Sequence, residues 1–216
     1  MYNLFMFDLD GTLTDSAPSI IGSMVYTAGL YGIEVSDPNE LRKYIGPPLR
    51  DTFKDILGLP EDKMSEVVSA YRKYYAETAI FKTTVYPGII NLLKQLKNDG
   101  ATIAIATSKA KIYAESIAEF LKIRQYFDFV SGCELNGTRE LKSELIEYVF
   151  ENIDPARKLK AVMIGDRSQD IIGANETGIN SAGVLWGYGS KQELEDAGAT
   201  YIAETTDELY KKLKGA

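Results

Sequence analysis

Two short acidic segments carry the side chains best suited to chemistry in this sequence. Asp8 and Asp10 lie two residues apart near the N-terminus, and Asp166 and Asp170 form a second group far along the chain. Each group directly follows an apolar run, which is typical of a buried strand that ends in a loop. Carboxylates brought together from two such loops repel one another unless a cation compensates their charge. We therefore expect a Mg²⁺ ion held by oxygen atoms of Asp8, the Asp10 backbone carbonyl and Asp166.

The composition restricts the chemistry further, because the chain of 216 residues contains no histidine. Carboxylates must then perform proton transfer near neutral pH, and a catalytic metal must bind through oxygen, which favours Mg²⁺ over Zn²⁺. The single cysteine, Cys133, rules out an internal disulfide and fits a reducing compartment. Each acidic segment alone would also suit a polar turn, but the two together indicate a site.

Hydroxyl and cationic side chains that suit an anionic ligand occur at three further places. Thr107, Ser108 and Lys109 follow an apolar run and are expected to open a helix, where hydroxyls and amides would face an anion. Lys142 is expected at another helix start, although a lysine there is also common on surfaces. Arg50 and Lys109 could each bind a second anionic group of a substrate, and Arg50 could equally be a solvated helix residue.

The elements expected to position these residues alternate between strand and helix. Continuous apolar strands separated by amphipathic helices predict an α/β fold with a doubly wound, Rossmann-like parallel sheet. Ligands of such sheets bind at the carboxyl ends of the strands. The expected strands are Leu4–Phe7, Thr102–Ala106, Phe127–Ser131, Ala161–Ile164 and Ser181–Leu185.

One segment interrupts this alternation and contains only helical patterns. We expect residues 16–82 to form an inserted all-helical cap domain, and residues 1–15 and 83–216 to form the α/β catalytic core domain. The cap is rich in tyrosine, and helical spacing favours packing over a stacking platform for a nucleobase. Its tyrosines are Tyr26, Tyr31, Tyr44, Tyr71, Tyr74 and Tyr75.

The chain resembles the haloacid dehalogenase-like hydrolase superfamily over its whole length. Four motifs of that superfamily occur in order as Asp8-Leu9-Asp10-Gly11-Thr12, Thr107, Lys142 and Gly165-Asp166 with Asp170. The insert looks like the small helical cap of this superfamily. Within it, Gly46–Asp51 resembles the cap segment of phosphoglycolate phosphatase-like members. The resemblance thus implies that this chain has a capped α/β fold and uses a Mg²⁺ cofactor.

The resemblance also implies a role for each matched residue. Asp8 would be the nucleophile that forms an aspartyl-phosphate, and Asp10 the general acid and base. Thr107 would donate a hydrogen bond to the phosphoryl group, and Lys142 would hold Asp8 and that group. Asp166 would bind the metal, and Asp170 would bind it too or contact its ligands. Ser108, Lys109 and Arg50 are the candidates for substrate binding.

These expectations describe a Mg²⁺-dependent phosphatase for a small phosphorylated metabolite. The substrate stays open among 2-phosphoglycolate, a 5′-nucleotide, pyrophosphate and a sugar phosphate. A phosphomutase of the β-phosphoglucomutase type is the first alternative, although such mutases usually carry Glu-Asp where this chain has Gly165-Asp166. A receiver-like signalling module is the second, and Asp10 and the cap count against it.

The net charge and the N-terminal segment indicate which partners and which location to expect. The net charge of -7, with both signs mixed along the chain, argues against nucleic acid and an anionic membrane surface as partners. The N-terminal segment has no basic region, and its apolar run is too short for a signal or membrane span. We therefore expect a cytoplasmic protein that is a monomer or homodimer.

Overall fold

The computed structural model describes residues 2–47, 49–136, 138–153 and 160–215. The chain divides into two compact units. The α/β unit comprises Met1–Asp15 and Thr84–Ala216, and the helical unit comprises Ser16–Thr83. Pro48, in the segment used for the family resemblance, lies outside the described residues.

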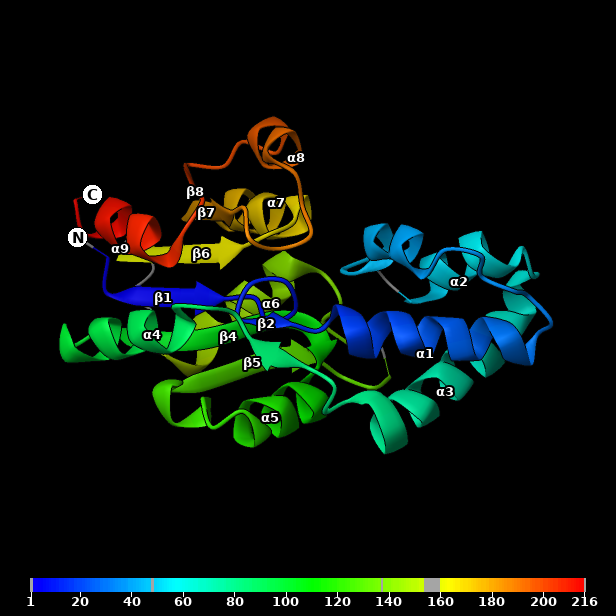
Figure 1. The fold of residues 1–216 in the computed structure, drawn as a ribbon. Coiled ribbons are helices and arrows are strands. Elements are labelled where there is room, and N and C mark those ends of the chain that lie inside the picture. The colour runs from blue at the N-terminus through cyan, green and yellow to red at the C-terminus, as the bar shows by residue number, and fades with distance from the viewer. Residues whose placement is uncertain (1, 48, 137, 154–159, 216) are drawn as a thin grey trace. The chain divides into compact units, whose positions relative to one another are not determined.

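A six-stranded parallel sheet forms the centre of the α/β unit (Figure 1), with strand order β5-β4-β1-β6-β7-β8. All five strands expected from the apolar runs are present, and β8 is an additional short strand at the sheet edge. The predicted α/β fold with a parallel sheet is therefore confirmed. The strands are β1 Leu4–Phe7, β4 Thr102–Ala110, β5 Phe129–Cys133, β6 Ala161–Gly165, β7 Asn180–Val184 and β8 Tyr201–Ala203.

Strand β1 lies in the interior of the sheet because all four of its side chains are apolar and buried. Its last residue, Phe7, is level with Ile105 of β4 and Ile164 of β6. The following amide continues this pairing, since the Asp8 N–H donates to the Ile164 carbonyl at 2.9 Å. The chain thus leaves the sheet at Asp8 between two neighbouring strands, where a parallel sheet places its ligands.

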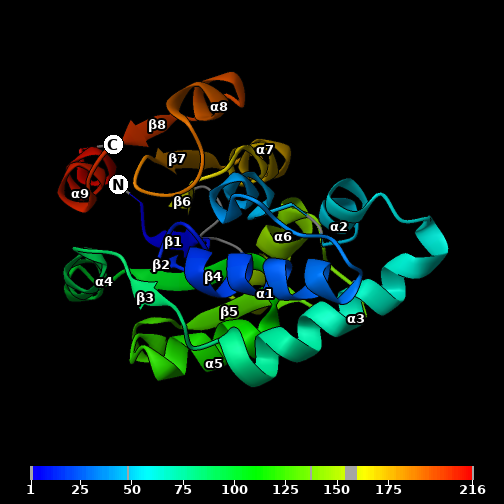
Figure 2. The same ribbon diagram turned by 45° about the vertical axis from the view of Figure 1, so that its right-hand side comes forward.

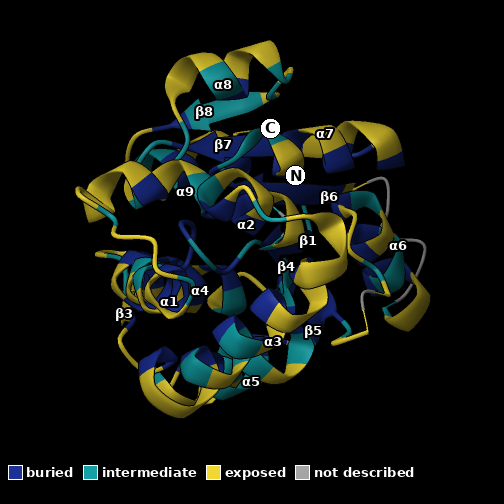
Figure 3. Ribbon diagram, turned by 90° about the vertical axis from the view of Figure 1, so that its right-hand side faces the viewer, coloured by how far each residue is buried: buried dark blue, intermediate teal, exposed yellow. Residues whose placement is uncertain are grey.

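Helices cover both faces of the sheet, because right-handed crossovers that run in opposite directions along the strand order lie on opposite faces. Helices α4 and α9 pack together on one side of the strands, and α6 and α7 pack together on the other (Figure 2). Their inward sides and the strands are buried, whereas their outward sides are exposed (Figure 3). The helices of this unit are α4 Ile89–Asn98, α5 Lys111–Phe120, α6 Lys142–Asn152, α7 Ser168–Thr177, α8 Lys191–Asp196 and α9 Thr206–Lys214.

A two-stranded antiparallel ribbon adjoins both chain connections to the helical unit. It pairs β2, Thr14–Asp15, with β3, Thr84–Val85. Asp15 is the last residue before the helical unit, and Thr84 is the first residue after it. The ribbon therefore ties the two connections together inside the α/β unit.

The helical unit contains helices and no strand among its described residues. Its main helices are α1 Ala17–Leu30, α2 Leu49–Leu57 and α3 Met64–Tyr74, and a π-helical turn, Tyr75–Ala79, extends α3. Four of its tyrosines pack on one another in pairs. Tyr26 stacks on Tyr74 with ring centroids 3.8 Å apart, and Tyr71 stacks on Tyr75 with ring centroids 5.9 Å apart. In the described part of the chain, no helix is long and apolar enough to span a membrane.

Candidate active site

Asp8 opens a tight loop at the carboxyl end of β1. Its Oδ1 accepts a hydrogen bond from the Leu9 N–H at 2.8 Å. The Leu9 carbonyl then accepts the amides of Leu13 and Thr14 at 3.0 and 2.9 Å, which turns the chain back on itself. The carboxylate of Asp8 is therefore attached to a rigid turn, and its side chain is only 13% exposed.

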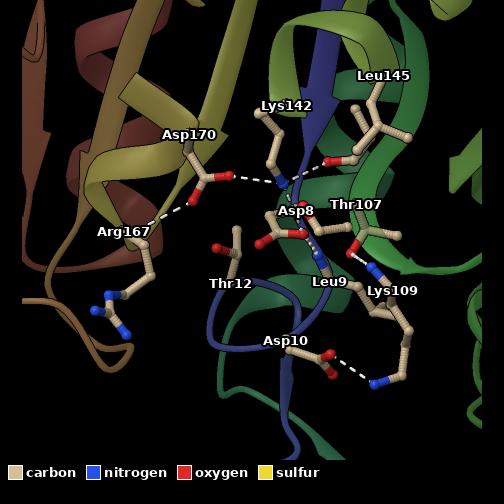
Figure 4. Close-up of polar contacts among 12 residues, drawn as sticks. Asp8, Leu9, Asp10, Thr12, Thr107, Lys109, Lys142, Leu145, Arg167 and Asp170 are labelled. Atoms are coloured by element: carbon tan, nitrogen blue, oxygen red, sulfur yellow. Dashed lines mark hydrogen bonds and ion pairs between the residues drawn. The ribbon is translucent and has the colours of Figure 1, made fainter. Parts of the chain in front are cut away.

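Lys142, the first residue of α6, places a buried cation against this carboxylate. Its Nζ lies 3.1 Å from Asp8 Oδ1 and 2.8 Å from Asp170 Oδ1 (Figure 4), and it donates to the Ala106 carbonyl at 3.0 Å. Burial acts to lower the pKa of Lys142, but the charges of Asp170 and Asp8 outweigh burial and raise it above its ordinary value. The ammonium group is therefore charged at neutral pH.

Asp166 follows β6 and is completely buried. Its Oδ1 accepts from the Thr12 hydroxyl at 2.9 Å, and its Oδ2 accepts from the Tyr188 N–H at 2.8 Å. Burial, and then the charges of Asp170 and Asp8, raise the pKa of Asp166 to about 8 despite these donors. The carboxyl group therefore has a fixed orientation, and in the metal-free chain burial and the two neighbouring carboxylates outweigh the donors that favour its ionised form.

Two glycines allow the carboxyl groups to approach the backbone. Gly11 has φ +84°, in the left-handed region, and a Cβ there would lie 2.3 Å from Asp166 Oδ2. A Cβ on Gly165 would lie 2.1 Å from the Asp170 carboxyl carbon. Larger residues at either position would displace the carboxyl groups.

The carboxylates of Asp8, Asp166 and Asp170 form a cluster that fits a divalent cation. One oxygen of each lies within 4.8 Å of the others. Lys142 supplies a single positive charge to the three, and burial raises the pKa of Asp170 to about 6 even though Lys142 opposes this. An all-oxygen donor set with surplus negative charge suits a hard divalent metal ion. The structure thus brings Asp8, Asp166 and Asp170 together, and the part of the Asp10 backbone carbonyl in metal binding stays a prediction.

Asp10 points to a different cation, Lys109. The Lys109 Nζ lies 2.6 Å from Asp10 Oδ2 (Figure 4), and both side chains are largely buried. This contact joins residues 99 positions apart. Lys109 therefore holds the side chain that the family resemblance implies is the acid and base.

The expectation that Thr107, Ser108 and Lys109 open a helix is wrong. All three lie inside β4, which continues to Ala110, and α5 begins only at Lys111. The longer strand is favoured because β5 pairs with β4 on both sides of a register shift, at Thr107 and again at Ala110. Thr107 is buried and its Oγ1 accepts the Lys109 N–H at 3.3 Å, whereas the Ser108 hydroxyl donates to the Glu140 carbonyl at 3.5 Å.

Arg50 belongs to the helical unit, where it has partners of its own. Its Nη2 lies 2.8 Å from Glu61 Oε1, and its Nη1 donates to the Ser65 hydroxyl at 3.2 Å. Its side chain is 49% exposed. A contact between Arg50 and a substrate stays a prediction.

Three residues near the cluster were not assigned a role from the sequence. Thr12 and Tyr188 donate to Asp166, and Trp186 Nε1 donates to the Thr12 carbonyl at 2.9 Å. Thr12 lies within the first acidic motif and could have been proposed from its place there. Tyr188 gives no such signal, because it contacts Asp166 through a backbone N–H that almost any residue could provide.

Comparison with known proteins agrees with this geometry. The family model described as haloacid dehalogenase-like hydrolase matches residues 5–184. A crystal structure of a predicted phosphatase from Clostridium acetobutylicum superposes with a TM-score of 0.93, at 40% identity, covering 100% of both chains.

Curated relatives carry several enzyme names. A 5′-nucleotidase of Pseudomonas aeruginosa is 37% identical over 89% of this chain and 87% of its own length. Tyrosine-protein kinase PtkA of Mycobacterium tuberculosis is 34% identical over 97% of this chain and 72% of its own length. A phosphoglycolate phosphatase of Aquifex aeolicus is 32% identical over 86% of this chain and 85% of its own length.

These matches confirm the resemblance and the assignment to a phosphatase-type enzyme class. The family match covers most of the chain, and the motif residues Asp8, Asp166 and Asp170 meet in one cluster. The chain belongs to the haloacid dehalogenase-like hydrolase family.

Proposed function

We propose that this protein is a Mg²⁺-dependent phosphomonoesterase that forms a transient aspartyl-phosphate on Asp8. The observation that carries the proposal is the position of the Asp8 carboxylate, which lies between buried Lys142 and the Asp166 and Asp170 carboxylates. Bound through Asp8, the Asp10 backbone carbonyl and Asp166, with Asp170 beside them, Mg²⁺ would offset the charge of the phosphoryl group and of the nucleophile. A carboxylate with this degree of charge compensation can approach an anionic phosphate ester.

The chain's own residues then divide the reaction into two displacements. An Asp8 oxygen attacks phosphorus, the bond to the ester oxygen breaks, and Asp10 protonates the departing alcohol. A water molecule next attacks the phosphorus, Asp10 takes its proton, and the bond to Asp8 breaks to release phosphate. Lys142 remains protonated throughout and stabilises the charge that develops on the phosphoryl oxygens. Lys109 holds Asp10 in place through the 2.6 Å ion pair.

The hydrolase is favoured over a phosphomutase by the surroundings of Gly165. Mutases of the β-phosphoglucomutase type usually have glutamate at this place in the motif. Here a Cβ on Gly165 would lie 2.1 Å from Asp170, so a glutamate would force Asp170 away from Lys142. Membership of a hydrolase family also disfavours a receiver-like module.

The relatives' names suggest which esters should be tested first. A panel should contain 5′-nucleoside monophosphates, 2-phosphoglycolate, pyrophosphate and sugar phosphates, each assayed for phosphate release with Mg²⁺. ATP with a tyrosine-containing peptide belongs in the same panel because of the kinase relative. We expect the highest kcat/KM for a small monoester and no transfer to the peptide.

The decisive variant is Asp8→Asn, because an amide cannot serve as the nucleophile. We expect an intact fold by circular dichroism, no phosphorylated species by intact mass, and a loss of turnover of more than about a hundredfold, or about 2.7 kcal/mol. Asp99→Asn is the matched control, since Asp99 is a partly exposed carboxylate paired with Lys214. Turnover above roughly a hundredth of wild type in Asp8→Asn would show that Asp8 is not the nucleophile.

A further inference from the structure

The loop that follows β7 packs its backbone directly on Asp166. A Cβ on Gly187 would lie 2.4 Å from the Asp166 Cβ and 2.3 Å from the Gly11 carbonyl oxygen. A Cβ on Gly189 would lie 1.9 Å from the Asp166 carbonyl oxygen. Between these glycines, the Tyr188 N–H donates to Asp166 Oδ2 at 2.8 Å. The position of this loop therefore determines where one donor to the Asp166 carboxylate lies.

The aromatic residues beside these glycines anchor the loop through side-chain hydrogen bonds. Trp186 Nε1 donates to the Thr12 carbonyl at 2.9 Å, and the Tyr188 hydroxyl donates to Asp15 Oδ1 at 3.0 Å. Asp15 ends β2 in the ribbon that adjoins the connections to the helical unit. Tyr188 thus spans from this ribbon to Asp166, with its hydroxyl at one end and its amide at the other.

The Tyr188 hydroxyl has a carboxylate acceptor in this position. Asp15 offers the Oδ1 atom that accepts its hydrogen bond at 3.0 Å. A hydrogen bond to a carboxylate is stronger than one between neutral groups, so it restrains the ring of this partly buried tyrosine.

We propose that Tyr188 is a positioning residue whose hydroxyl, anchored on Asp15, holds the backbone N–H that orients Asp166 toward the metal ion. This inference rests on the proposed function, because it concerns how well Asp166 binds Mg²⁺. Groups that orient a metal ligand through hydrogen bonds contribute about ten- to a hundredfold to metal affinity or activity. The effect of the hydroxyl is transmitted through one residue, so we expect the lower end of that range.

The test compares Tyr188→Phe, which deletes only the hydroxyl, with Tyr210→Phe. The Tyr210 hydroxyl donates to Asp99 Oδ2 at 2.8 Å on an exposed part of the same unit, so the control loses the same kind of bond. Mg²⁺ affinity is measured by titration calorimetry on the metal-free chain. We expect about tenfold weaker binding for Tyr188→Phe, unchanged binding for Tyr210→Phe, and similar Tm values for both metal-free variants.

Substitutions at Asp15 test the other end of the same bond. Asp15→Asn keeps a carbonyl oxygen that can accept from Tyr188, so Mg²⁺ affinity should stay within about twofold of wild type, whereas Asp15→Ala should weaken it about tenfold. The double variant of Tyr188→Phe and Asp15→Ala should bind no more weakly than either single variant, because both remove one interaction. Additive losses would show that the residues act separately.

The outcomes separate this inference from the proposed function. Wild type that binds Mg²⁺ and hydrolyses esters, with equal affinity in Tyr188→Phe, would overturn the positioning role alone. Wild type that binds no Mg²⁺ would overturn the proposed function and the inference with it. If Tyr188→Phe lowered the Tm of the metal-free chain far more than Tyr210→Phe without changing Mg²⁺ affinity, the hydroxyl would be structural only.

Discussion

Mg²⁺ binding to this chain should release a proton near neutral pH, and the source of that proton should be Asp166. The pKa of Asp166 is raised to about 8 in the metal-free chain, chiefly by burial and then by Asp170 and Asp8. A metal ion binds the ionised carboxylate, so Mg²⁺ and the proton compete for this group. Affinity for Mg²⁺ should therefore increase as the pH rises toward and past 8.

The size of the effect follows from the pKa. With one competing proton and a pKa of about 8, the apparent Kd for Mg²⁺ should fall about tenfold between pH 7 and pH 9, which is about 1.4 kcal/mol. Binding should release about 0.9 proton per ion at pH 7 and about 0.1 at pH 9. Asp170, with a pKa of about 6, is largely ionised throughout this interval and adds little.

The same shift predicts how the stability of the metal-free chain depends on pH. The folded-state pKa of Asp166 lies above its ordinary value of 3.8, so the folded chain keeps a proton that the unfolded chain has lost. This group therefore makes the free energy of unfolding decrease as the pH rises from about 4 to about 8. Mg²⁺ removes the penalty, so the increase in Tm that it causes should be larger at pH 8 than at pH 6.

Calorimetric titration of Mg²⁺ in two buffers of different ionisation enthalpy measures both Kd and the protons released. Asp99→Asn is a suitable control because it removes a partly exposed carboxylate in the same unit, and it should leave proton release unchanged. A Kd that differs by less than about twofold between pH 7 and pH 9, with less than about 0.2 proton released at pH 7, would refute the reasoning about Asp166.

Two further predictions concern Asp10 and Arg50. Asp10→Asn should retain Mg²⁺ but slow both chemical steps. With an aryl phosphate, whose leaving group needs little protonation, the first step should be slowed less than the second. Rapid-quench measurements should then show a burst of phenol, and intact mass should show accumulated phosphorylated enzyme. Equal slowing for aryl and alkyl esters without a covalent species would contradict the acid and base role. Arg50→Ala should raise KM for the natural substrate and spare a small generic ester. Glu61→Gln, which removes the carboxylate that pairs with Arg50 and Lys54 but keeps Arg50, should leave both KM values unchanged. Equal losses on both esters in Arg50→Ala would place Arg50 outside the substrate site.

Local sequence patterns were sufficient to predict the elements that position the carboxylates. Leu4–Phe7 and Ala161–Ile164 are apolar runs short enough to be buried strands, and each ends at an acidic loop. Parallel pairing then follows from the alternation of such strands with amphipathic helices. Because the carboxyl ends of parallel strands lie at the same edge of a sheet, the sequence alone predicts that Asp8 and Asp166 meet.

Local patterns were less reliable where two structures suited the same residues. Thr107 and Ser108 have hydroxyls that can cap a helix, but they also suit a strand. Pairing with β5, which is 20 or more residues away in sequence, decided for the strand and moved the helix start to Lys111. Strand β8 was missed because it has only three residues, of which two are partly exposed.

The partners of the site residues were decided by tertiary structure alone. Lys109 meets Asp10 across 99 positions of sequence, and Tyr188 contacts Asp166 across 22 through its backbone. A lysine on a helix or strand has the same local pattern whether it faces solvent or a carboxylate, and a backbone amide has no residue-specific signal. The residue types and the strand ends thus determined that carboxylates gather at the carboxyl edge of the sheet. Long-range packing decided which cation, hydroxyl and amide stabilise each carboxylate.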